Sequence, residues 1–205
     1  IVYCEGNFGK FDGKTANGLI RHSQAYRIVS VIDSSHNRQD SGQILDDVIN
    51  NIPIFGNLKA AVVHERKVPD TFIYGMAPST GKLSSQDRIV ILDAIAMGMN
   101  IVSGLHEYLS EDSEIAAFAS KHDVTIRDIR KPKQSKDMRL FDGSIKNVNA
   151  VRIAVLGTDC AIGKRTTATV LARALNAKGI KTVLVGTGQT GLMQGAKYGV
   201  AMDAV

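Results

Sequence analysis

The residues whose types and spacing are best suited to chemistry form one stretch, "GTDCAIGKRTT", which spans residues 157–167. A β-rich run precedes it and a helix-like run follows it, which is the arrangement of a phosphate-binding loop. Glycines in such a loop let backbone N–H groups turn toward an anion, and the helix N-terminus adds unpaired donors and a favourable dipole. We therefore predict that a phosphate cofactor binds at Gly157, Thr158, Asp159, Cys160, Ala161, Ile162, Gly163, Lys164, Arg165, Thr166 and Thr167.

Two details of the stretch bear on which phosphate it binds. Five residues separate its two glycines, one more than in the common G-x-x-x-x-G-K loop. The longer spacing resembles the loop of dethiobiotin synthetase and related P-loop enzymes. The residue after Lys164 is Arg165, where phosphate loops usually place a hydroxyl that binds Mg²⁺. Because arginine cannot ligate a cation, either Thr166 or Thr167 is redirected or the site holds no tightly bound metal.

Two kinds of cofactor therefore remain as candidate ligands of the loop. ATP would bring Mg²⁺ with it, whereas coenzyme A or acetyl-CoA would present a diphosphate that Lys164 and Arg165 can neutralise directly. Mg²⁺ is expected only with ATP, and no residue is assigned to a metal site. No side chain is identified as catalytic.

Candidate substrate contacts lie outside the loop. Gln189 and Thr190 belong to a Gly/Thr/Gln cluster, "VGTGQTGLMQGAKYG", that follows the next predicted strand. His106 ends another strand in "SGLHEYL". Ligands of open parallel sheets bind at the carboxyl ends of strands, so these side chains could hydrogen-bond a small-molecule substrate. The alternatives to substrate binding are that residues 185–199 form a flexible turn and that His106 is an ordinary polar loop residue.

The first glycine-rich stretch, "EGNFGKFDGKTANG", also follows a strand-like run. Gly6, Gly9 and Gly13 do not match the dinucleotide-binding fingerprint, although Asp33 ends the next strand at about the position of a ribose-binding acid. The pattern favours a Rossmann-like domain and leaves open whether that domain binds a nucleotide.

Strand-like and helix-like segments alternate along the chain, which predicts an α/β fold with parallel sheets. We predict a Rossmann-like domain at 1–130, a linker at 131–150 and a P-loop NTPase-like domain at 151–205. Strands are expected at 1–6, 26–33, 70–76, 100–105 and 123–129, and helices at 14–23, 41–49, 84–99 and 110–122. The second domain shows only strand 151–157, helix 163–177 and strand 178–188. Because so few elements cannot cover a parallel sheet on both faces, we expect this domain to be incomplete in the chain.

Composition narrows the class of protein. The 205 residues carry a net charge of +5, and much of the basic excess lies between Arg127 and Arg139. No aromatic residues alternate with those charges, so a solvated linker is favoured over a nucleic-acid site. No apolar run is long enough for a membrane span, and no signal peptide precedes the first strand. Two cysteines without a disulfide framework favour a cytoplasmic protein. Assembly into a homo-oligomer is left open.

Three segments, "GLHEYLSE", "GTDCAIGKRTTA" and "GTGQTGLMQG", occur in this order. Together they resemble a bacterial and archaeal family catalogued as a domain of unknown function. Its members join a Rossmann-like N-terminal domain to a P-loop domain related to dethiobiotin synthetase. The resemblance implies a phosphate-cofactor site at Gly157, Gly163, Lys164 and Thr166.

One branch of that family is described as D-glutamate N-acetyltransferases. The resemblance therefore favours an acetyl-CoA-dependent transferase acting on a D-amino acid or another small carboxylate. An ATP-dependent carboxylate ligase like dethiobiotin synthetase is the alternative enzyme, and a nucleotide-binding regulatory module is the alternative without catalysis.

Overall fold

A computed structural model describes the chain except residues 79, 133–135, 137–139, 160–161 and 205. Within the described residues, six parallel strands form one sheet in the order β3-β2-β1-β4-β5-β6. Its strands are β1 (Val2–Tyr3), β2 (Val31–Ile32), β3 (Ile54–Phe55), β4 (Thr71–Tyr74), β5 (Asn100–Ser103) and β6 (Ile126–Asp128). The chain leaves β1 toward β2 on one side and later returns to β4 on the other. This reversal is the topological switch point of a Rossmann-like sheet, and it confirms the predicted α/β fold.

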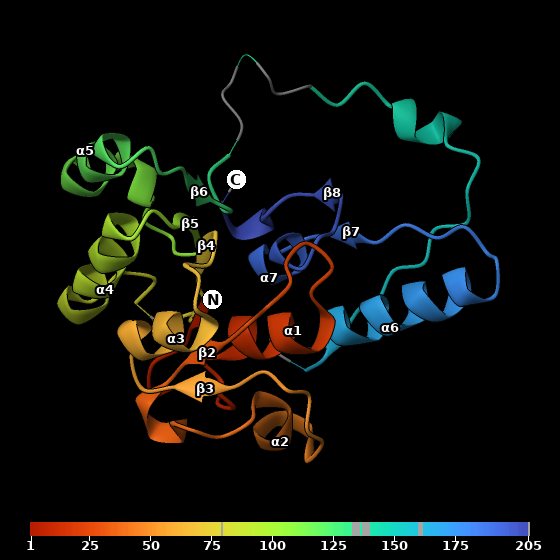
Figure 1. Ribbon diagram of the computed structural model, residues 1–205. Coiled ribbons are helices and arrows are strands. Elements are labelled where there is room, and N and C mark those ends of the chain that lie inside the picture. The colour runs from red at the N-terminus through yellow and green to blue at the C-terminus, as the bar shows by residue number, and fades with distance from the viewer. Residues whose placement is uncertain (79, 133–135, 137–139, 160–161, 205) are drawn as a thin grey trace.

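Helices connect the strands and cover the sheet. They are α1 (Lys14–His22), α2 (Ser41–Asp46), α3 (Leu58–Glu65), α4 (Ser85–Ala96) and α5 (Ser113–Lys121). Figure 1 shows α4 and α5 on one side of the sheet and α1 on the other. Helices α2 to α5 begin at side chains that accept hydrogen bonds from first-turn amides, namely Asp40, Asn57, Ser84 and Asp112. Short 3-10 helices flank them at Ser34–His36 (η1) and Leu109–Glu111 (η2).

The second half of the chain is less regular than its sequence predicts. After η4 (Ser144–Asn147), it contains α6 (Lys164–Ala177), β7 (Val185–Gly186), α7 (Gln189–Met193), β8 (Tyr198–Gly199) and η5 (Met202–Ala204). Within the described part of the chain, β7 and β8 form a separate parallel pair. Figure 1 shows η4 far from the six-stranded sheet.

Residues 151–157, predicted to be a strand, are not in one. Val151 and Leu156 are 91% and 85% exposed, and no described strand pairs with the segment. A strand needs a neighbour to satisfy its backbone groups, so β-propensity alone does not form one. The predicted strand at 178–188 is likewise reduced to β7. Helix α6, whose hydrogen bonds are internal, forms within one residue of the predicted 163–177.

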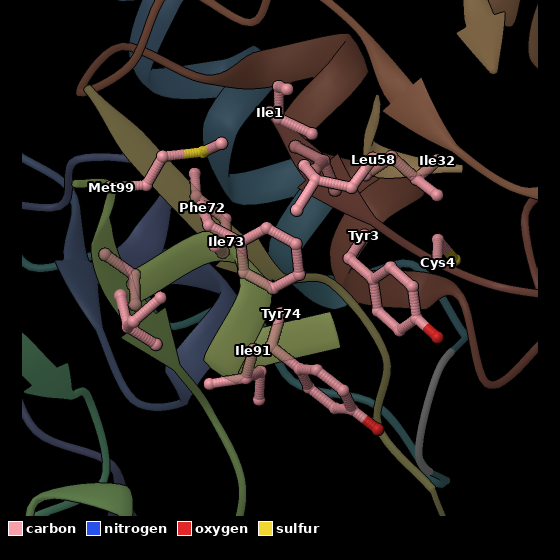
Figure 2. Close-up of a cluster of buried hydrophobic side chains, with 14 of the residues drawn as sticks. Ile1, Tyr3, Cys4, Ile32, Leu58, Phe72, Ile73, Tyr74, Ile91 and Met99 are labelled. Atoms are coloured by element: carbon pink, nitrogen blue, oxygen red, sulfur yellow. The ribbon is translucent and has the colours of Figure 1, made fainter. Parts of the chain in front are cut away.

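The core lies between the six-stranded sheet and its helices and is built from aliphatic and aromatic side chains (Figure 2). A buried carboxylate, Asp87 in the first turn of α4, lies beside it. It accepts hydrogen bonds from the Tyr3 hydroxyl at 2.6 Å and the Tyr74 hydroxyl at 3.0 Å. These bonds tie α4 to β1 and β4. Burial, followed by Asp87 itself, raises the pKa of both tyrosines, so both hydroxyls stay protonated as donors.

Replacing Asp87 with alanine should lower the free energy of unfolding by about 3 kcal/mol, because two buried hydroxyls would lose their acceptor. The Tyr3→Phe change removes one donor and should cost about 1 kcal/mol. Urea denaturation of the two variants measures both values. Equal losses in the two variants would contradict the shared-acceptor arrangement.

None of the helices in the described parts of the chain combines the length and the apolar composition needed to cross a bilayer.

Candidate functional site

The glycine-rich loop leads directly into α6. Gly163 is the N-cap of the helix and has a φ of 96°, in the left-handed region that favours glycine. At Gly157, an added Cβ would lie 2.4 Å from Cδ1 of Ile162 and 3.1 Å from the stem of Lys164. The side chains of Ile162 and Lys164 therefore lie closely over Gly157, and the backbone conformation favours glycine at 163.

Positive charge gathers at the start of α6, together with backbone amides that lie outside the helical ladder. The Lys164 ammonium donates a hydrogen bond to the backbone carbonyl of Asp159, across the loop. The amide of Thr167 donates to the carbonyl of Gly163 at 2.9 Å, so the three amides before it lie outside the helical ladder. Donors in this arrangement fit an anion, and a phosphate could replace the Asp159 carbonyl as the partner of Lys164.

The two residues after Lys164 have different surroundings. The guanidinium of Arg165 lies against α1, where its Nη1 would be 2.6 Å from a Cβ on Gly18. Burial and then Arg21 lower the pKa of Arg165. Thr166 is half-buried and Thr167 exposed in the first turn of α6. The structure thus gives Arg165 and Lys164 separate partners, which the sequence did not indicate. Cys160 and Ala161 lie outside the described residues.

Helix α7 lies in the contact between the two halves of the chain. The hydroxyl of Thr190 is 3.0 Å from that of Thr15, in a buried pair at the start of α1. Gln189 is buried and packs on Gly104 together with Met193. The two residues predicted to contact substrate therefore take part in the interdomain contact, and substrate binding by them stays a prediction.

The α7 contact continues at the end of the helix. The side-chain amide of Gln194 donates a hydrogen bond to the backbone carbonyl of Gly18. The backbone carbonyl of Gln194 accepts from the backbone amide of Gln24 at 2.7 Å. Sequence reasoning missed Gly18. A glycine inside a helical pattern was the available signal, since it often marks close packing.

His106 lies at an open cavity of about 600 Å³ beyond the end of β5. Its ring lies over Gly81, where an added Cβ would be 2.8 Å from Cδ2. The cavity is lined by the first turn of α4 and by the segment around η2, including Ser84, Arg88, Glu107 and Asp112. Arg88 forms a two-point ion pair with Asp112 at 2.7 Å, and this bond lowers the Asp112 pKa to about 2.

An ion pair between a buried arginine and a half-exposed aspartate, which the sequence did not indicate, lies close to His106. Arg130 donates to the carbonyl of Gly104 at 2.7 Å and pairs with Asp203 of η5. Burial would raise the pKa of Asp203, but Arg130 and then His106 outweigh it, and the pKa is lowered. The pair joins the end of β6 to the end of the chain, which local sequence patterns do not reveal.

The first glycine loop is satisfied internally. Asp33 is fully buried and accepts from the amides of Gly6 at 3.2 Å and Phe8 at 2.9 Å, as well as from Ser35. The amide of Ala16 in α1 donates to Gly75 at 2.9 Å. Donors that a dinucleotide-binding domain would direct at phosphates are therefore bound to the protein's own carboxylate and carbonyl.

A histidine marks the contact between α1 and α6. Nδ1 of His22 accepts a hydrogen bond from Arg173 of α6 at 3.2 Å, and the backbone carbonyl of His22 accepts from the same guanidinium at 3.0 Å. Burial, then Arg173 and Arg165, lower the His22 pKa below its usual 6.5. The folded chain therefore binds this proton less readily than the unfolded chain does.

The pH dependence of stability follows from that shift. The contribution of neutral His22 to the free energy of unfolding should be fully present above about pH 6.5 and should decline as the pH falls through that value. The free energy of unfolding of the wild type, compared with that of His22→Gln from about pH 8 to pH 5, measures it. A difference that is constant over this range, or that grows on acidification, would contradict the placement of His22 beside Arg173.

Both halves of the chain match domains of one known protein family. Residues 34–132 match the domain of unknown function DUF1611_N, a Rossmann-like domain, and residues 139–205 match the DUF1611 P-loop domain. A solved DUF1611 family protein from Anabaena variabilis superposes on the whole chain with a TM-score of 0.85 at 30% sequence identity. This chain spans 57% of that protein.

Two curated relatives carry a functional name. Proteins named D-glutamate N-acetyltransferase from a Pseudoalteromonas species and from Tritonibacter scottomollicae are 36% and 35% identical over 135 residues. The aligned part is 66% of this chain and 39% of each relative. From the two domain matches and the superposition, the chain belongs to the DUF1611 family, with a Rossmann-like N-terminal domain and a P-loop C-terminal domain.

Proposed function

We propose that residues 157–167 bind the pyrophosphate of acetyl-CoA and that the protein transfers the acetyl group to the amine of a D-amino acid such as D-glutamate. The observation that carries the proposal is the arrangement at the start of α6. The first-turn amides outside the helical ladder, the Lys164 ammonium and a glycine-containing loop meet there. The names of the two curated relatives support acetyl transfer to D-glutamate.

The loop's residues fit a diphosphate without a dedicated metal ligand. Amides of the first turn of α6 would donate to phosphate oxygens, and Lys164 would exchange the Asp159 carbonyl for a phosphate. The position that usually supplies a Mg²⁺-binding hydroxyl is Arg165, whose guanidinium lies against α1. This placement favours a cofactor whose phosphates need no bound cation.

Acetyl-CoA supplies the acetyl group as an activated thioester. The chain's own task is to hold the cofactor and bring an amine close to it. His106, at the open cavity, is our candidate for contact with the amino-acid substrate.

ATP-dependent activation of a carboxylate is the second candidate. The five-residue loop spacing favours it, as does Thr167, which is exposed in the first turn of α6. In that case a threonine hydroxyl would have to bind Mg²⁺ in place of the residue at position 165.

Calorimetric titration of the chain with CoA, acetyl-CoA, and ATP with and without Mg²⁺ separates the two candidates. We expect CoA and acetyl-CoA to bind independently of Mg²⁺. Release of free thiol from acetyl-CoA, measured with and without D-glutamate, tests the transfer itself. Binding of ATP that depends strictly on Mg²⁺, with no binding of CoA, would replace the proposal by the ligase.

A further inference from the structure

Both helices of the P-loop half meet α1 at one glycine. Gly18 lies in the middle of α1. The guanidinium of Arg165 packs against its Cα, and its backbone carbonyl accepts a hydrogen bond from the side chain of Gln194. Arg165 directly follows the loop lysine, and Gln194 follows α7. We propose that Arg165 is a positioning residue, which holds the start of α6 on α1 and so orients the loop's anion-binding amides.

A side chain at position 18 would require the Arg165 guanidinium to move. An alanine Cβ there would lie 2.6 Å from Nη1, 2.9 Å from Nη2 and 3.0 Å from Cζ of Arg165. Glycine inside a helix is less favourable than alanine by about 1 kcal/mol, so its use in α1 calls for a steric reason. The side chain of Arg165 supplies one. A serine or threonine at 165, as in most phosphate loops, would be too short to make this contact.

The surroundings of Arg165 indicate a packing role rather than an ion pair. Arg21 and Arg173 contribute positive charge to the same face of α1 and α6, and Asp46 is paired with Arg21. Among the described residues, Nη1 of Arg165 is buried without a hydrogen-bond partner. The position of the guanidinium therefore depends on its fit against Gly18, and a small change at Gly18 should displace it.

Displacement of Arg165 has a direct consequence for the loop. Arg165 is the second residue of α6, and its own amide is one of the three outside the helical ladder. These amides point along the axis of α6, so their aim depends on how the first turn lies on α1. Figure 1 shows α6 beside the end of α1. Arg173, two turns after Arg165, makes a second contact by donating to the backbone carbonyl of His22.

A double-mutant cycle in the 205-residue chain tests the proposal, which rests on phosphate binding by the loop. The variants are Arg165→Ala, Gly18→Ala and the double variant, titrated with CoA and with ATP in the presence of Mg²⁺. We expect each single change to weaken binding of the ligand that the wild type binds by about fivefold, and the double change to weaken it no further. Arg173→Ala is the matched control, because it removes another arginine of α6 that contacts α1 but lies two turns away from the loop. It should leave the affinity unchanged.

Gly18→Ala distinguishes positioning from direct contact with the anion. The change leaves Arg165 intact but pushes it off α1. If Arg165 bound the phosphate itself, affinity would stay the same or rise in Gly18→Ala, and that result would overturn the proposal. An Arg173→Ala variant that loses as much affinity as Arg165→Ala would overturn it as well.

Unfolding measurements on the same proteins examine the contact independently of any ligand. Gly18→Ala should lower the melting temperature of the wild type but raise that of Arg165→Ala, where alanine's better helix propensity is no longer offset by a clash. If the wild type binds neither ligand, the proposed function fails, and this change of sign still decides whether Arg165 holds α6 on α1. The same effect of Gly18→Ala in both backgrounds would overturn the contact.

Discussion

Replacing Lys164 with alanine is expected to weaken the binding of acetyl-CoA by about 10- to 100-fold, the range for loss of one charge-assisted hydrogen bond to phosphate. The melting temperature should change little. Without ligand, the ammonium donates to the carbonyl of Asp159, an exposed residue. Calorimetry gives the affinity, and a thermal-shift assay gives the stability.

Lys178→Ala is the matched control for this prediction, because Lys178 is the C-cap of the same helix and exposed. It removes the same charge from the opposite end of α6 and should leave the affinity within about twofold, since charges at that distance are largely screened. If Lys164→Ala bound acetyl-CoA as tightly as the wild type, the loop would not be the cofactor site. The proposed transferase would then have no phosphate-binding element.

The largest loss of stability is expected from Asp33→Ala. Asp33 is fully buried, and its two carboxylate oxygens accept from the amides of Gly6, Phe8 and Ser35 and from the Ser35 hydroxyl. Removing it leaves buried donors without acceptors, for which we expect a loss of about 3–5 kcal/mol. Domains commonly have about 5–15 kcal/mol in total, so a loss of this size would be visible in any denaturation curve.

Two further variants sharpen the Asp33 test. Asp33→Asn keeps one acceptor oxygen but places an NH₂ group against an amide donor, so its loss should fall between those of wild type and Asp33→Ala. Asp93→Ala removes an exposed aspartate from α4 and should change the free energy of unfolding by less than about 0.5 kcal/mol. Urea denaturation measures all three variants. A loss below about 1 kcal/mol for Asp33→Ala would show that the first glycine loop does not depend on this carboxylate.

Local patterns predicted the N-terminal half well. Helix α4 lies within the predicted 84–99, and its N-cap Ser84 accepts from the Asp87 amide. Helix α1 ends within one residue of the prediction. Helix periodicity, caps and terminal glycines act within a few residues of sequence, so they are readable without knowledge of the fold. Strand lengths were predicted less well, because the ends of strands depend on neighbours that lie far away in the sequence.

For Asp33, the sequence predicted the position at the end of a strand but left the function of the carboxylate open. It ends the second strand, where a Rossmann-like fold could place a ribose-binding acid. The structure instead surrounds it with the amides of the first glycine loop. Spacing along the chain cannot distinguish these outcomes, since a carboxylate at the end of a strand can accept hydrogen bonds from a ligand or from the protein itself.

The sequence by itself determined the alternation of strands and helices, the glycine loop at 157–163 and the helix that starts at Lys164. Each of these depends on residues close together in the chain. Only the tertiary structure showed the contacts of Arg165, Thr190 and Gly18, because their partners lie more than a hundred residues away. It also decided that residues 151–157 remain outside any sheet, because a strand requires a neighbour to satisfy its backbone, whereas a helix satisfies its own.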